Sequence, residues 1–322
     1  MERVLVTGVQ GFVGANLVGH LLVKEGVSEI VGIYRTERRL SPLKILGLRD
    51  QVTLVRGDIR DYKFVKEVLA EHRIDTVFHL AAQAIVGVAM DDPVSTFDIN
   101  VMGTLTLLEA CRHYGKIEAF YYQSTDKIYG EGKNVREWDP MCPVEPYGLS
   151  KMCADCIARM YYSVYKLPVV VARDCNIFGP GDIHRRIIPN TIRKALRGES
   201  PIIFKNYPGV RQYIYIDDAV RAAILLVDRI EETKGKAYNV GTNDVLSQED
   251  VVWIILNHFP GVKPKYVEKE RGVREIEEQS MDWSQIREEL GWEPKTSFTE
   301  GIKKTVDWWK RISEVYPEIV FL

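Results

Sequence analysis

A tyrosine and a lysine four positions apart, Tyr147-Gly-Leu-Ser-Lys151, are the residues best placed to do chemistry in this sequence. Residues four apart on a helix share a face, so we expect both side chains to project from the same side. A nearby ammonium group lowers the pKa of a phenol from its usual value of about 10. Such a tyrosine can take the proton of a hydroxyl group while hydride leaves the same carbon.

A glycine-rich loop near the N-terminus, Thr7-Gly-Val-Gln-Gly-Phe-Val-Gly14, predicts the site of the hydride acceptor. Glycines allow a tight turn and close approach of the main chain to a pyrophosphate, and a helix N-terminus supplies free N–H groups. The alternative is a glycine-rich turn with no ligand. The loop residues that we expect to contact a dinucleotide are Gly8, Gln10, Gly11, Phe12, Val13 and Gly14.

The end of the second predicted strand bears on the choice of dinucleotide. Many NAD-binding folds place an acidic residue there for the ribose hydroxyls, but this chain has Tyr34 followed by Arg35. A guanidinium can pair with a 2′-phosphate, so we expect NADP rather than NAD. Asp58 and Ile59, after the third strand, are expected at the adenine. The alternative for Asp58 is a loop carboxylate that caps the next helix.

Apolar strand-like runs alternate with helical patterns through the first half of the chain, which is typical of a doubly wound parallel (Rossmann) α/β sheet. We expect a dinucleotide-binding domain over residues 1–175 and a smaller substrate-binding domain over 176–322, with an interleaved boundary. The predicted strands are 4–7, 29–34, 52–56, 76–80, 119–123, 169–172 and 237–240. The predicted helices include 15–24, 63–71, 95–114, 147–165 and 217–228.

The composition excludes several classes of protein. The 322 residues are 46% hydrophobic and 27% charged, with a net charge of −2, which gives no global field for nucleic acid or anionic membrane. The N-terminus lacks a signal-peptide pattern, and no apolar run is long enough to span a bilayer. Five scattered cysteines favour a reducing, cytoplasmic setting. Cys153 and Cys156 have no partner pair, so we expect no metal site.

Five motifs together resemble the extended short-chain dehydrogenase/reductase family, in particular its nucleotide-sugar epimerases and dehydratases. The resemblance also covers the stretch 211–217 and the closing Leu-Gly-Trp-Glu-Pro at 290–294. The motifs are Thr7–Gly14, His79-Leu-Ala-Ala-Gln83, Ser124-Thr-Asp-Lys-Ile-Tyr-Gly130, Tyr147–Lys151 and Arg173-Asp-Cys-Asn-Ile-Phe-Gly-Pro180.

The resemblance implies roles for individual residues. Thr125 matches the residue that hydrogen-bonds the sugar 4-hydroxyl beside Tyr147, and Lys151 matches the one that binds the nicotinamide ribose. Asn176 and Arg211 match positions that grip the substrate diphosphate, and Arg274 resembles a second phosphate-binding arginine. The 79–83 motif is expected to give Leu80, Ala81 and Ala82 to the cofactor site and Gln83 to the substrate site.

Asp126 and Lys127 favour a 4,6-dehydratase over a 4-epimerase. Elimination of water needs an acid at the C6 hydroxyl and a base at C5, which we assign to Asp126 and Lys127 in that order. Lys127 can act as a base only if desolvation or neighbouring positive charge lowers its pKa. The alternative is an exposed ion pair after a strand.

The Asp-Lys pair resembles that of CDP-glucose 4,6-dehydratases, which makes CDP-glucose our first substrate hypothesis. The strand end at Arg35 departs from that pattern and looks more like NADP-using GDP-mannose 4,6-dehydratases. A 4-epimerase, a reductase of 4-keto sugars and a non-catalytic dinucleotide-binding regulator stay open as alternatives. Helices 95–114 and 147–165 match those that pair into a four-helix bundle in this family, so we expect a homodimer.

Overall fold

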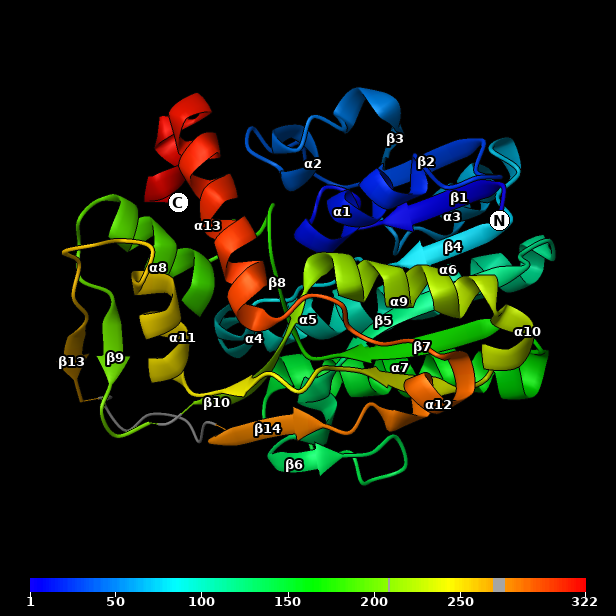
Figure 1. Ribbon diagram of the computed structural model, residues 1–322. Coiled ribbons are helices and arrows are strands. Elements are labelled where there is room, and N and C mark those ends of the chain that lie inside the picture. The colour runs from blue at the N-terminus through cyan, green and yellow to red at the C-terminus, as the bar shows by residue number, and fades with distance from the viewer. Residues whose placement is uncertain (208, 269–275) are drawn as a thin grey trace.

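Seven parallel strands form the larger sheet of the computed structural model, which describes residues 1–207, 209–268 and 276–322 (Figure 1). Their spatial order is β11-β7-β5-β4-β1-β2-β3, and every neighbouring pair is parallel. The strands are β1 (Arg3–Thr7), β2 (Glu29–Tyr34), β3 (Thr53–Arg56), β4 (Thr76–His79), β5 (Ala119–Thr125), β7 (Val169–Asp174) and β11 (Ala237–Val240).

The chain order reverses between β1 and β4, which creates a crevice at the carboxyl ends of the strands. The run Val4-Leu-Val is fully buried, as expected for a central strand covered on both faces. Thr7 and His79 end these two strands in register, and their side chains hydrogen-bond at 2.7 Å. The imidazole also contacts Thr104 at 2.9 Å, so this buried histidine ties the strand ends to a helix.

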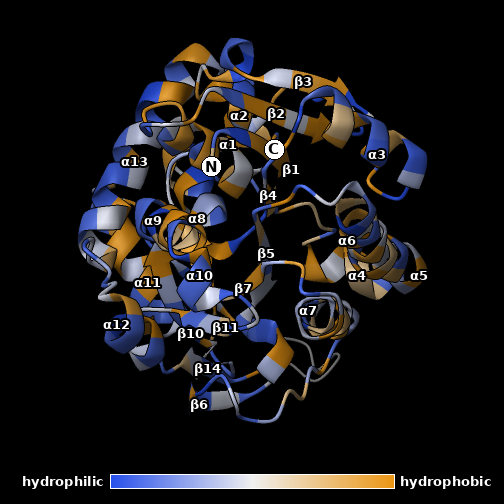
Figure 2. Cartoon of the chain, turned by 90° about the vertical axis from the view of Figure 1, so that its right-hand side faces the viewer, coloured by the Kyte–Doolittle hydropathy of each residue, from blue (hydrophilic) through white to orange (hydrophobic). Residues whose placement is uncertain are grey.

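Helices cover both faces of the sheet (Figure 2). One face packs against α1 (Phe12–Leu21) and α9 (Ile216–Asp228), and the other against α3 (Tyr62–Glu71), α6 (Gly103–Tyr114) and α7 (Pro146–Tyr165). The apolar stripes of these helices and the two faces of the strands form two separate buried clusters. The remaining helices are α2 (Pro42–Ile45), α4 (Val86–Asp91), α5 (Pro93–Phe97), α8 (Ile187–Leu196), α10 (Ile230–Thr233), α11 (Gln248–Leu256), α12 (Ser284–Leu290) and α13 (Phe298–Val315), with short turns η1 (Arg49–Gln51), η2 (Asp98–Met102), η3 (Asp126–Tyr129) and η4 (Pro317–Phe321).

A smaller sheet lies beyond the β7 and β11 edge and carries much of the second half of the chain (Figure 1). Its order is β12-β10-β14-β6, with β8 paired to β10. Segments are exchanged between the two parts of the fold, because β6 comes from the first half of the chain while β11 joins the large sheet. The domain division at residue 176 stays a prediction. The strands are β6 (Gly132–Val135), β8 (Asn176–Phe178), β10 (Val210–Tyr215), β12 (Val245–Leu246) and β14 (Glu278–Met281), and a separate pair joins β9 (Ile202–Phe204) to β13 (Lys265–Val267).

The predicted doubly wound parallel sheet is confirmed, and strands 29–34 and 237–240 have the predicted bounds. The helix predicted over 95–114 differs, because α5 and α6 are joined through η2, a π-helical turn. The first helix begins at Phe12 rather than at residue 15, since the glycine loop leads directly into it. The smaller sheet was not predicted. Its strands are short and pair over long sequence separations, which leaves little periodic signal.

Candidate active site

A cleft of about 640 Å³ opens at the carboxyl ends of β4, β5 and β7 and continues toward β10 and α8. It brings together all five residues that the sequence singled out for chemistry: Thr125, Asp126, Lys127, Tyr147 and Lys151. Predicted binding residues also line it, namely Val13, Leu80, Ala82, Asn176 and Arg211. The reactive pair and the predicted cofactor loop therefore face a common space.

The glycine loop has the geometry that close approach of a ligand requires. Gly8 has φ +72°, and a Cβ there would lie 2.8 Å from the main-chain nitrogen of Ala81. A Cβ on Gly14 would lie 2.4 Å from the Gly8 carbonyl oxygen, so the helix packs directly on the loop. Gly11 donates its N–H to Gly8 at 2.9 Å, which closes the turn before α1. These features fit a dinucleotide pyrophosphate at the N-terminus of α1.

Side chains of the loop divide between core and cleft. Phe12 is 4% exposed and belongs to the core, and Gln10 is also buried, so only Val13 lines the cleft with its side chain. Ala81 donates its N–H to the Thr7 hydroxyl at 3.2 Å, which fixes the loop after β4 against the glycine loop.

Helix α7 holds Tyr147 and Lys151 in place through contacts at its N-terminus and at its middle. Glu145 caps the helix by accepting from the N–H groups of Tyr147 at 2.6 Å and Gly148 at 2.7 Å. Further along, the buried carboxylate of Asp155 accepts from the Arg173 guanidinium at 3.0 and 3.1 Å, which ties the helix to β7. A buried charge pair of this kind is costly to break from one side.

The surroundings of the tyrosine and lysine push both pKa values away from the charged forms. Burial lowers the pKa of Lys151 to about 7, although Asp155 and Asp174 oppose that shift. Burial raises the pKa of Tyr147 to about 12, opposed by Arg186 and by a hydrogen bond with Thr125. The lowering of the tyrosine pKa that we expected is therefore not supplied by the protein's own groups.

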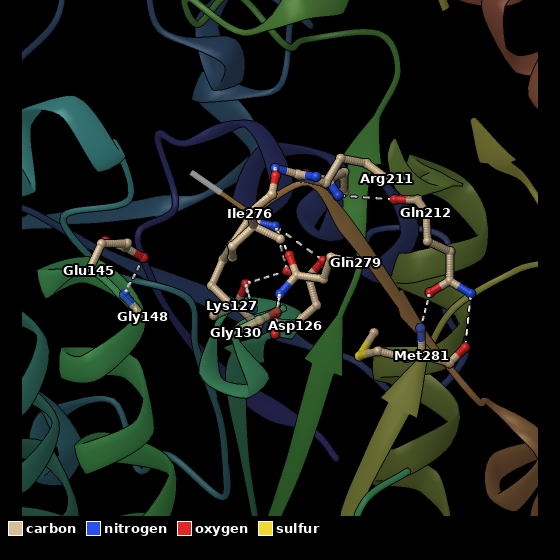
Figure 3. A network of polar contacts seen from close by, with 12 residues as sticks. Asp126, Lys127, Gly130, Glu145, Gly148, Arg211, Gln212, Ile276, Gln279 and Met281 are labelled. Carbon is tan, nitrogen blue, oxygen red and sulfur yellow. Dashed lines mark hydrogen bonds and ion pairs between the residues drawn. The ribbon is translucent and has the colours of Figure 1, made fainter. Parts of the chain in front are cut away.

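Asp126 and Lys127 form a buried ion pair on the turn η3 (Figure 3). The ammonium donates to both carboxylate oxygens of Asp126, at 3.0 and 3.2 Å. The two side chains are only 3% and 16% exposed, so the alternative of an exposed surface pair is wrong. Burial lowers the pKa of Lys127 and Arg211 lowers it further, while Asp126 opposes both. This is the direction that a basic role for Lys127 requires.

Two of the predicted substrate residues line the far end of the cleft. The Asn176 amide donates to the Gln212 carbonyl at 3.0 Å, and Arg211 donates to the hydroxyl of Tyr207 at 2.7 Å. Gln83 does not line the cleft, because its amide bonds the loop that follows it, accepting from Ile85 N–H at 2.7 Å. Arg274 lies outside the described residues.

The predicted contact of Asp58 and Ile59 with the adenine stays a prediction, and the alternative role of Asp58 as a helix cap is wrong. Asp61, not Asp58, caps α3. The Asp58 carboxylate instead accepts hydrogen bonds from the Arg60 guanidinium at 2.6 and 3.0 Å. That hydrogen bond, with burial opposing it, lowers the pKa of Asp58. Arg35 is exposed and close enough to add to the shift, and Ile59 is buried.

Two buried side chains of the site were not predicted from the sequence: Asp174, which lines the cleft, and Gln279, which contacts Lys127. Asp174 is 3% exposed, and neither of its carboxylate oxygens has a hydrogen-bond partner among the described residues. Burial raises its pKa to about 8, with repulsion from Asp126 adding to the shift and Lys151 opposing it. Its place at the end of an apolar strand was a usable signal. Gln279 lies on β14 and hydrogen-bonds Lys127 and the turn η3. No feature of the sequence around Gln279 indicated these contacts.

A parallel sheet with a glycine loop at its switch point and a Tyr–Lys pair at its carboxyl edge defines a dinucleotide-binding α/β protein of the dehydrogenase type. The chain belongs to the GDP-mannose 4,6 dehydratase family, whose model matches residues 5–305. The expected membership in a nucleotide-sugar dehydratase and epimerase group is thereby confirmed.

Individual relatives cover almost the whole chain. It is 32% identical to a dTDP-glucose 4,6-dehydratase of Xanthomonas campestris pv. campestris, covering 96% of this chain and 93% of that one. A structure of the dTDP-glucose 4,6-dehydratase DesIV from Streptomyces venezuelae with NAD bound matches with a TM-score of 0.88 and 27% identity, covering 98% and 99%. A UDP-glucose 4-epimerase from Thermotoga maritima, solved with UDP-glucose, gives a TM-score of 0.86 and 29% identity, covering 96% and 98%.

These relatives do not support the expected preference for NADP, because the solved dehydratase carries NAD. Arg35 is exposed on the loop after β2, and an arginine at this place is no sufficient sign of a 2′-phosphate site. In the part of the chain that the structure describes, no helix has the length and apolar character needed to cross a membrane.

Proposed function

We propose that this protein is a nucleotide-diphosphate-hexose 4,6-dehydratase. The observation that carries the proposal is the buried Asp126–Lys127 pair, which lines the same cleft as Tyr147 and Lys151. The tyrosine and lysine suffice for oxidation at C4, as in an epimerase. A buried acid and amine beside them supply what elimination of water from C5 and C6 needs in addition.

The reaction begins with proton removal from the sugar 4-hydroxyl by Tyr147. A nicotinamide dinucleotide held at the glycine loop would supply the hydride acceptor for C4 and the hydride donor for C6. Lys151, with its Nζ donating to the Gln123 carbonyl, lies in the cleft beside the tyrosine. Arg186 and the hydrogen bond with Thr125 favour the phenolate, which burial of Tyr147 disfavours.

Elimination requires Asp126 to be protonated and Lys127 to be neutral. Moving one proton from the lysine to the carboxylate converts the ion pair into this state without any exchange with solvent. The lysine lone pair then takes the C5 proton, the C5–H electrons form the C5–C6 double bond, and the C6 hydroxyl leaves as water with the proton from Asp126. Lys127 is then the ammonium and Asp126 the carboxylate again. The ammonium can return its proton to C5 when hydride reaches C6.

Thr125 links the two halves of the site and closes the proton balance. Its hydroxyl donates to the Asp126 carboxylate at 3.1 Å and also hydrogen-bonds Tyr147. After one turnover Tyr147 holds the proton of the 4-hydroxyl and Asp126 lacks one. Transfer from Tyr147 to Thr125, and from Thr125 to Asp126, restores both groups.

We propose a nucleoside-diphosphate glucose as substrate, CDP-glucose first, and NAD as cofactor. Arg211 and Asn176 at the far end of the cleft suit a diphosphate. The Asp-Lys pair supports CDP-glucose by resemblance, whereas the dehydratase relatives act on dTDP-glucose according to their names. NAD is supported by the solved dehydratase, and the exposed Arg35 gives NADP no defined pocket.

A panel of sugar nucleotides tests the proposal directly. The purified protein is incubated with CDP-glucose, dTDP-glucose, GDP-mannose, UDP-glucose and UDP-N-acetylglucosamine, each with NAD or NADP. The expected result is a product lighter by one water from one donor, detected by mass spectrometry. A product of unchanged mass with a new diastereomer in the NMR spectrum would instead establish a 4-epimerase, which the match to the Thermotoga maritima enzyme keeps as the second candidate.

We also propose that the protein is a cytoplasmic homodimer. The dimer is supported by apolar side chains that are exposed along α5, η2 and α7 on the outer face of the large sheet. The cytoplasmic location is supported by the five cysteines, which are all free, as in a reducing compartment. Val164→Glu should shift the mass in light scattering from dimer to monomer. An unchanged mass would move the interface elsewhere. The exposed residues are Val94, Met102, Leu149, Met160, Val164 and Tyr165.

A further inference from the structure

Gln279 reaches the catalytic pair from the smaller sheet (Figure 3). It is 1% exposed, and its Nε2 donates to the main-chain oxygens of Asp126 at 2.9 Å and Gly130 at 2.6 Å. Its Oε1 accepts from the Lys127 ammonium. Carbonyl oxygens can only accept, so just one orientation of the amide satisfies all three contacts, with the NH2 on the turn and the oxygen on the lysine.

This contact fixes where the lysine can point its free electron pair. A neutral amine has two hydrogens and one lone pair. In this state Asp126 is the protonated acid, and its unprotonated oxygen and the Gln279 oxygen accept one hydrogen each from the amine, so the lone pair must occupy a remaining tetrahedral direction. A lysine side chain has four flexible carbons, and one acceptor alone would leave it free to rotate about that bond.

The absence of charge on the Gln279 side chain matters as much as its shape. An amide oxygen accepts a hydrogen bond without adding a negative charge beside the ammonium. A carboxylate in the same place would be a second anion at Lys127 and would favour the charged form of the amine. The titratable groups that already act on Lys127 are Asp126 and Cys175, which favour the ammonium, and Arg211, which disfavours it, and the Glu145 carboxylate is also close enough to interact with the ammonium.

Gln279 also connects the pair to the strand that carries the proposed diphosphate residue. It lies opposite Arg211 in the parallel pairing of β10 with β14, and opposite Gly132 in the pairing of β14 with β6. The position of Lys127, on the end of the large sheet, is therefore set from the same small sheet that would hold the nucleotide.

We infer that Gln279 is a positioning residue for proton abstraction at C5, which it serves by aiming the neutral amine of Lys127 into the cleft. This role rests on the proposed dehydratase function. It predicts that changes at Gln279 affect elimination of water while they spare oxidation at C4, in which Lys127 takes no part.

The test compares Gln279→Met and Gln279→Glu with Gln212→Met. Gln212 is the matched control because it is a buried glutamine on β10 whose amide bonds only main-chain groups, those of Thr242 and Met281, and makes no contact with Lys127. Reduced cofactor formed in the first turnover reports C4 oxidation, and release of water-depleted product reports elimination.

For Gln279→Met we expect elimination to slow by about 10- to 100-fold, while C4 oxidation stays within about threefold, as a misplaced base would produce. Gln212→Met should change the two rates together, if at all. Equal slowing of both steps in Gln279→Met would make Gln279 a structural residue only and overturn the inference, as would two unchanged rates.

A second measurement does not depend on turnover. The NMR signal of the Lys127 Cε–Nζ group, followed against pH, should titrate at higher pH in Gln279→Glu than in the parent, and the pH profile of elimination should move the same way. An unchanged lysine titration in a Gln279→Glu variant whose circular dichroism matches that of the parent would overturn the inference, whether or not the variant turns over. If the parent protein removed water from no donor, the proposed function would fail as well, which the panel of sugar nucleotides shows separately.

Discussion

The buried carboxyl of Asp174 makes the stability of this protein depend on pH in a direction that can be worked out from the structure. Burial raises its pKa from 3.8 to about 8 in the folded chain. Between these values the folded chain keeps the proton and the unfolded chain has lost it. The contribution of Asp174 to the free energy of unfolding is therefore fully present below pH 3.8. It falls by about 1.4 kcal/mol per pH unit as the pH rises toward 8.

Asp174→Asn removes the titration and keeps the size of the side chain. At pH 4 the variant and the parent should be nearly equally stable, because the parent carboxyl is protonated when folded. At pH 7 the variant should be more stable by up to about 4 kcal/mol, the integral of the slope from pH 3.8 to 7. Lys151 has a pKa of about 7 in the folded chain, below its ordinary 10.5. Its contribution to the free energy of unfolding therefore rises with pH only above 7, where the folded chain has lost the proton and the unfolded chain still holds it.

The assay is urea unfolding followed by circular dichroism at several pH values between 4 and 7. Asp50→Asn, which removes an exposed carboxylate, is the control and should change stability by no more than about 0.5 kcal/mol. A difference between Asp174→Asn and the parent that does not grow with pH would refute the reasoning. So would a parent protein that is the more stable of the two at pH 7.

Three further variants test the site. Asp126→Asn should keep C4 oxidation, seen as reduced cofactor, while loss of water slows by about 10²- to 10⁴-fold, the usual worth of a general acid; retention of both activities would remove Asp126 from the mechanism. Tyr147→Phe should abolish C4 oxidation and leave sugar-nucleotide binding by calorimetry within about threefold, since it removes one hydroxyl from the reacting carbon. Gly14→Ala places a methyl group 2.4 Å from the Gly8 carbonyl, so NAD affinity should fall by at least about tenfold, and unchanged affinity would mean that the loop adapts.

The large sheet and the reactive residues on it were predictable because their signals are local. Buried parallel strands read as short apolar runs, and Tyr147 and Lys151 are set by one helical turn. The order of motifs along the chain then placed the glycine loop and the Tyr–Lys pair at one edge of the sheet, where the cleft lies. The NADP expectation failed because it depended on where one flexible arginine, Arg35, would point.

What the sequence could not show depends on contacts between distant segments. Gln279 meets Lys127 across 152 positions, and it does so only because β14 pairs with β10 and β6. Asp174 lies two residues beyond the predicted strand 169–172, and its raised pKa follows from burial that only the packed fold creates. Gln83 lay in a matching motif, yet local hydrogen bonds to Ile85 use its amide.

The same low-polarity surroundings explain both the reactivity of the site and its cost. Burial moves Lys127 and Lys151 toward their neutral forms and Asp174 toward its protonated form, so each group lies nearer to the state in which protons move. Groups shifted in this way stabilise the folded chain less than the same groups in water would. The buried Asp155–Arg173 pair and the glutamine that anchors η3 fix the segments around these groups. Stability gained at Asp174 by substitution should therefore be tested for lost activity, because the carboxyl lies in the cleft beside the proton-transfer groups.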